Sequence, residues 1–128
     1  MNATISILFW LSLAALFATK AADVVTTVRH VGADGESNPL ARAWFGRFGF
    51  TGGLVLVCAI YSLIAGGQYT LVWRFGGAFS RAANALVGFG IAWAQWDVAC
   101  VKAGKPHSWF TRFALKAYAA WGCRMGRR

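Results

Sequence analysis

The chain has 128 residues, of which 58% are hydrophobic and 13% are charged, and its formal net charge is +9. A soluble domain usually carries about 25% charged residues, which cover its core with polar surface. Here the charges are also uneven, because residues 1–19, 49–73 and 82–96 have none. The composition excludes an ordinary soluble domain. It predicts an all-α integral membrane protein, one domain over residues 1–128, with about three transmembrane helices and a C-terminal amphipathic interfacial helix.

The excess of positive charge is concentrated at the C-terminal end. Seven basic residues follow the third apolar stretch: Lys102, Lys105, Arg112, Lys116, Arg124, Arg127 and Arg128. Basic residues beside membrane helices set topology and meet anionic lipid head groups. We therefore expect the lipid bilayer as a partner, and no nucleic acid.

The first helix is predicted over about residues 4–30. Its first part is apolar all round, as lipid-facing helices are. Cleavage after Ala21 as a signal peptide remains an alternative, but no basic segment precedes the apolar run, so a retained helix is favoured. Lys20, Asp23, Thr27 and His30 follow spacings of three, four and three, which places them on one helix face.

A loop and a second membrane helix follow. Residues 31–39 are rich in turn-forming residues, and Pro39 suits the first turn of a short helix over residues 40–47. The second membrane helix is predicted over residues 48–65, ending at Gly66-Gly67. Gly49 and Gly53 form a small-xxx-small pair, which predicts close packing against another helix in lipid.

The rest of the chain contains a third membrane helix and an amphipathic segment. Residues 68–80 either extend the second helix or form a connector, and the third helix is predicted over residues 82–101. An amphipathic helix over residues 108–123 has aromatic side chains on one face and basic ones on the other, which is typical of a helix in the membrane interface. A helix packed on a partner protein is the alternative. The membrane-surface residues expected here are Trp109, Arg112, Phe113 and Lys116.

The distribution of basic residues predicts the orientation. Three spans place the 31–39 loop and the C-terminus on one side, together with ten basic residues, whereas the other side has Arg74 and Arg81. The positive-inside rule then predicts an external N-terminus and a cytoplasmic C-terminus, with the bacterial inner membrane as the location.

The most informative polar cluster comprises Lys20, Asp23, Thr27, Glu36, Asn38 and Pro39. Lys20 and Asp23 can pair at one helical turn. If they lie deep in the membrane, Asp23 could bind a cation or relay a proton, with Thr27 as a second oxygen ligand. If they lie at the interface, Lys20 reaches water and Asp23 is hydrated. The 19 uncharged residues before Lys20 favour the interface.

The run Asp23-Val-Val-Thr-Thr27, followed by Gly35-Glu36-Ser37-Asn38-Pro39, resembles a family of small prokaryotic multi-pass membrane proteins of unknown function. That family has an Asp-x-x-Thr-Thr pattern at the end of its first helix and a Glu-x-Asn-Pro loop soon after. The resemblance covers about residues 10–65, implies several helices and names no reaction. We expect Glu36 and Asn38 to reach back to the end of the first helix and fix the hairpin.

Signatures of enzymes, metal sites and cofactors are missing. The sequence lacks Gly-x-Ser-x-Gly, His-Glu-x-x-His and a phosphate-binding glycine loop. Its three cysteines follow no zinc spacing. We therefore expect no catalytic residues, no metal and no cofactor.

Three functions remain open at this point. The favoured one is a non-enzymatic accessory protein or subunit of a membrane assembly, which implies a protein partner or a homo-oligomer. The alternatives are a holin-like pore-former and a small ion or proton carrier centred on Asp23.

Overall fold

The computed structural model describes residues 2–32, 35–36, 39–106, 108–109, 111–113, 116–117 and 120. Its elements are α1 (Ala3–Thr26), the π-helical turn η1 (Thr27–Val31), α2 (Pro39–Phe75) and α3 (Ala78–Lys102). The all-α class is confirmed, since these described residues contain helices and no strand. Two stretches, Ala3–Val31 and Pro39–Phe75, are long and apolar enough to cross a membrane.

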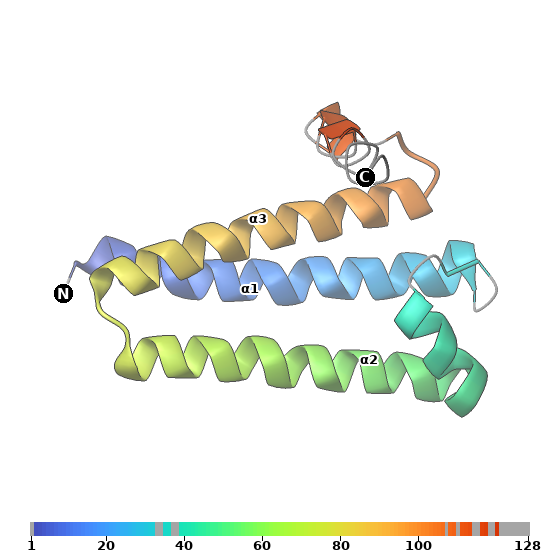
Figure 1. Cartoon of the computed structure of the whole chain (residues 1–128), viewed down its shortest axis with the longest axis horizontal. Helices are drawn as coiled ribbons and strands as arrows, with labels where there is room; N and C mark the ends of the chain where they lie inside the picture. Colours follow the sequence, from blue (N-terminus) through green and yellow to red (C-terminus); the bar gives the residue numbers. More distant parts are fainter. Residues whose placement is uncertain are drawn as a thin grey trace, which may run out of the picture.

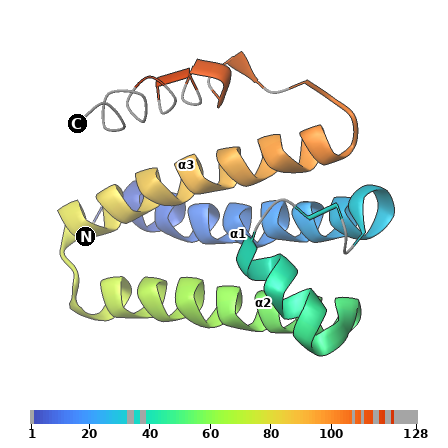
Figure 2. The ribbon, with the colours of Figure 1, turned by 45° about the vertical axis from the view of Figure 1, so that its right-hand side comes forward.

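The helices lie roughly parallel or antiparallel, with α1 between the other two (Figure 1). α3 packs along α1, and this pair makes by far the most extensive contact in the fold. α2 lies on the other side of α1 and approaches both helices much less closely. The two views of the ribbon agree that η1, the start of α2 and the end of α3 share one end of the bundle (Figures 1 and 2).

The first helix begins one residue before the predicted start and runs to its predicted end. Asn2 caps it, because its side-chain oxygen accepts a hydrogen bond from the Thr4 amide at 3.0 Å. From Thr27 the backbone widens into a π-helical turn. This turn changes the angular phase of the residues that follow. Thr27, where the turn begins, is buried, whereas His30 in the turn is exposed. The predicted common face of the helix therefore ends at Thr27.

The second helix does not end at Gly66-Gly67, and of the two alternatives for residues 68–80 the structure has the extension of the second helix. α2 continues to Phe75, and neither glycine has a positive φ. Both residues can therefore stay helical in a long apolar segment. The true break is at Gly76-Gly77, and α3 begins at Ala78, four residues before the predicted start at residue 82.

A kink divides α2 at Gly49, where φ is 75° and ψ is 167°. An L-residue with a side chain rarely adopts this conformation, so glycine is needed here. The kink separates the initial segment of α2, residues 39–48, from the long straight segment (Figure 2). The short helix that Pro39 was predicted to start is thus present as the first part of α2.

Candidate functional site

Four charged side chains meet at the end of the bundle where η1 lies beside the end of α3. The Lys102 ammonium of α3 lies 2.8 Å from Asp23 Oδ1 and 3.4 Å from Glu36 Oε2, and it donates to Thr27 Oγ1 at 2.7 Å. Lys20 Nζ lies 3.1 Å from Asp23 Oδ2, as the one-turn spacing predicted. We call Lys20, Asp23, Thr27, Glu36 and Lys102 the charge cluster.

The charge cluster is largely shielded from the exterior. Its four charged side chains are between 7% and 19% exposed. Two ammonium groups face two carboxylates, so the formal charges cancel. Buried charges persist where they are paired and hydrogen-bonded in this way. The cluster therefore joins α1, α3 and the loop residue Glu36, whose carboxylate pairs with Lys102 of α3. The expected direct contact of Glu36 with the end of the first helix stays a prediction.

The side-chain oxygens of Asp23 and Thr27, which were considered as ligands of a bound cation, already contact a protein ammonium group. Asp23 Oδ1 and Thr27 Oγ1 both contact the Lys102 ammonium. Within the described part of the chain, no three His, Cys, Asp or Glu side chains are grouped to hold a metal ion. The arrangement supports a structural ion pair better than a site for a free cation.

Lys102 was missed as a site residue, because it lies 79 residues from Asp23 in the sequence. Its one sequence signal is its position as the first basic residue after the third apolar stretch. Pro39 is the first residue of α2. Asn38 lies outside the described residues, so its expected reach toward the first helix stays a prediction.

The two glycines predicted to form a helix-packing face have other local roles. Gly49 is the kink itself, and a Cβ built there would meet nothing within 4 Å. A Cβ on Gly53 would collide with the ring of Phe45, which lies before the kink in α2. Gly53 therefore lets the two segments of α2 pack closely against each other. Packing of the Gly49 and Gly53 face against a further helix in lipid stays a prediction.

The close approach between helices occurs at Gly88 of α3, which the sequence reasoning missed. A Cβ there would collide with Tyr69 Oη of α2 and would lie 3.2 Å from Ser12 Oγ of α1. Ser12 and Tyr69 are themselves hydrogen-bonded at 2.7 Å, and both are buried. Gly88 thus marks one point where all three helices meet.

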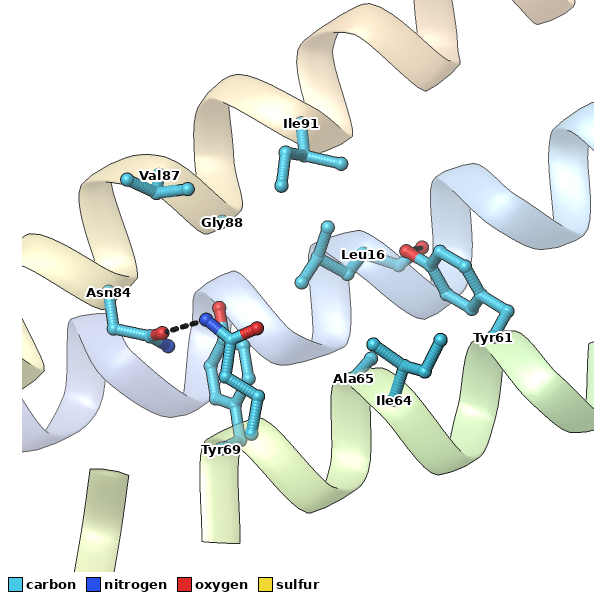
Figure 3. Close-up of a pocket in the computed structure, with 10 residues that line it drawn as sticks. Leu16, Tyr61, Ile64, Ala65, Tyr69, Asn84, Val87, Gly88 and Ile91 are labelled. Atoms are coloured by element: carbon cyan, nitrogen blue, oxygen red, sulfur yellow. Dashed lines mark hydrogen bonds between the residues drawn. The ribbon is translucent and has the colours of Figure 1, made fainter. Parts of the chain in front are cut away.

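Two further polar contacts link the helices. Gln95 of α3 bonds Thr19 of α1 at 2.9 Å and Tyr61 of α2 at 3.0 Å. Nearer the Gly76-Gly77 turn, Gln68 Nε2 donates to Asn84 Oδ1 at 2.7 Å, as Figure 3 shows with a dashed line ending at Asn84. In the sequence, the only sign of these contacts was that polar residues such as Gln68 and Gln95 stand alone within apolar stretches.

The segment after α3 turns back toward this helix, since the Ser108 amide donates to the buried carboxylate of Asp97 at 2.8 Å. Trp109 is 71% exposed and Phe113 is 67% exposed. Arg112 and Lys116 are exposed as well. The predicted amphipathic helix over residues 108–123 includes many residues outside the described set, so its place at a membrane surface stays a prediction.

Comparisons with protein-family models, with curated proteins and with solved structures found no match. The resemblance of the Asp23 and Glu36 motifs to a small prokaryotic membrane family therefore stays an expectation.

Proposed function

We propose that this protein is a three-helix integral membrane protein and a non-enzymatic accessory protein or subunit of a membrane assembly. The observation that carries the proposal is an inverted distribution of polarity. Leu63 is 74% exposed and Leu86 is 76% exposed, whereas Ser12 is 0% exposed. Hydrocarbon accepts an apolar exterior of this kind, whereas in water it would associate.

The length of the helices supports three spans. A bilayer core of about 30 Å takes about 20 helical residues. Counting from Arg81 along α3, that length reaches Lys102, and counting back from Arg74 along α2 it reaches Leu54. The charge cluster then lies at one interface, and the α2–α3 turn lies at the other. Of the two placements considered for Lys20 and Asp23, deep in the membrane or at its interface, this proposal adopts the interface.

Aromatic side chains support the second interface. Trp10 of α1 and Trp73 of α2 lie with their ring centroids 5.1 Å apart, and the Arg81 guanidinium lies 4.5 Å from the Trp73 ring centroid. Indole rings prefer the level of the lipid head groups. Trp10 and Trp73 therefore belong to one aromatic belt at this interface.

We further propose that the end carrying the charge cluster is cytoplasmic. Arg42 and Arg47 lie in the first segment of α2 and Lys105 follows α3, at that end, whereas Arg74 and Arg81 flank the α2–α3 turn at the other. The positive-inside rule gives this orientation, with the bacterial inner membrane as the location and anionic lipids as neighbours of the basic residues.

Orientation can be measured by labelling single cysteines with a membrane-impermeant maleimide after the native cysteines are replaced by alanine. We expect Ser80→Cys to react in intact cells and Lys105→Cys to react only after permeabilisation. The reverse pattern would refute the orientation, and release of the chain by alkaline carbonate would refute membrane integration.

The accessory role is tested by extracting the full chain in native-lipid particles and determining the composition of the complex. A stoichiometric protein partner or a defined homo-oligomer would support the role, and a lone monomer would contradict it. Loss of membrane integrity on expression would favour the holin-like alternative. Ion flux in proteoliposomes that is lost in Asp23→Asn would favour the carrier, which the pairing of Asp23 with two lysines does not support.

A further inference from the structure

A cleft between α2 and α3 contains a buried amide with an unused donor. Asn84 is 8% exposed, and its Oδ1 accepts the hydrogen bond from Gln68. Among the described residues, Asn84 Nδ2 has no hydrogen-bond partner. Buried amide donors nearly always have a partner, and the need is greatest where water is excluded. We therefore expect the Asn84 Nδ2 group to donate a hydrogen bond to an acceptor that is not part of the described fold.

The other walls of the cleft are mostly apolar, although Tyr61, Gln68 and Tyr69 also line it. Figure 3 shows Val87 and Ile91 of α3 on one side, Ile64 and Ala65 of α2 on the other, and Leu16 of α1 between them. The cleft is partly open to the exterior. Its shape and chemistry suit a flexible hydrocarbon chain that enters sideways and carries one acceptor.

The end of the cleft nearest Asn84 attracts negative charge. Arg81 precedes Asn84 by one helical turn, which is about 4.5 Å of rise. Gly77 precedes the first residue of α3 as its N-cap and makes no side-chain cap, and the first turn has no acidic residue, so the positive end of the helix dipole is available. Arg74 adds a further positive charge at the end of α2. An anionic group would be stabilised one turn outside the Asn84 donor.

We propose that this cleft binds one acyl chain of a membrane phospholipid. The ester carbonyl of that chain accepts a hydrogen bond from Asn84 Nδ2, and the phosphate lies near Arg81. A phospholipid fits because its ester carbonyls lie just below its phosphate, in the order in which Asn84 and Arg81 lie along α3. The inference rests on the proposed membrane location, and it adds a specific lipid site to it.

The test compares phospholipids that differ only at the carbonyl. The full chain is reconstituted in nanodiscs containing equal amounts of a diester and a diether phosphatidylglycerol, transferred to mild detergent, and examined by native mass spectrometry. We expect one retained lipid per chain, with the diester form preferred about fivefold to tenfold because only it has the acceptor. This comparison uses the wild-type chain and needs no variant to fold.

Variants locate the site. Asn84→Leu removes the donor, so the preference for the diester should vanish. Ala65→Trp fills the cleft and should lower retention of both lipids about tenfold. The matched control is Leu63→Trp, which places the same side chain two residues away at an exposed position that does not line the cleft, and it should change neither result.

Several outcomes would overturn the lipid site. These are equal retention of diester and diether lipid by the wild type, an unchanged preference in Asn84→Leu, and retention of a quinone in place of phospholipid from native membranes. A dimer that dissociates in Ala65→Trp would also overturn it, since a second copy would then occupy the cleft. Failure of the chain to enter nanodiscs would refute the membrane location itself, whereas entry without lipid retention would refute the site alone.

Discussion

Replacing Lys102 by methionine tests whether the charge cluster holds the helices together. The Lys102 side chain is 12% exposed and contacts Asp23, Glu36 and Thr27. Removing one member of a buried ion pair costs about 3–5 kcal/mol, because the remaining charge is left without its partner. Lys20 still faces Asp23 in the variant. Because Asp23 keeps this partner, we expect the free energy of unfolding to fall by about 2–3 kcal/mol, which is at or just below the lower limit of that range.

The assay is reversible unfolding by sodium dodecyl sulfate in mixed micelles, followed by circular dichroism. Lys105→Met is the matched control, since it removes the same charge from an exposed position three residues away and should change stability by less than about 0.5 kcal/mol. A double-mutant cycle with Asp23→Asn should give a coupling energy of about 1–3 kcal/mol. The reasoning fails if Lys102→Met is no more costly than Lys105→Met, or if the coupling energy is near zero.

Three further predictions concern the interior contacts and the kink, and the same unfolding assay checks them. Gly88→Ala should cost about 1–3 kcal/mol, because its Cβ would collide with the Tyr69 hydroxyl. Gly90→Ala meets nothing and should be neutral or stabilising by about 0.5–1 kcal/mol, and equal effects at both glycines would contradict the close approach. Gly49→Ala should cost about 1–2 kcal/mol because φ is positive, whereas Gly46→Ala, with open space around it, should not. Tyr69→Phe should cost about 1 kcal/mol through loss of the Ser12 hydrogen bond, and an unchanged stability would show that this bond contributes nothing.

The helices were largely predictable from the spacing of charges. Residues 4–30 and 82–101 were predicted to be helical, and the structure has helix over Ala3–Val31 and Ala78–Lys102. The second helix was harder, because glycine pairs occur both inside helices and at their ends. Gly66-Gly67 has space around it and stays helical, whereas Gly76-Gly77 ends α2. Whether a glycine pair continues or ends a helix depends on its surroundings in the folded chain, which the order of residues alone does not identify.

The candidate site could be predicted only where its residues are neighbours in the sequence. The pairing of Lys20 with Asp23 follows from one helical turn. The approach of Lys102 depends on how α3 rotates and slides against α1, which periodicity leaves open. The same holds for the contact of Gly88 with Ser12 and Tyr69, where a glycine matters because of residues in two other helices.

The partnership of the first and last helices has a consequence for biosynthesis. Thr19 and Asp23 find their partners Gln95 and Lys102 at separations of 76 and 79 residues. A ribosome delivers α1 long before α3 has emerged, so the polar groups of α1 have no Gln95 or Lys102 to contact during synthesis. Completion of the third helix is therefore the step that commits the nascent chain to its final assembly.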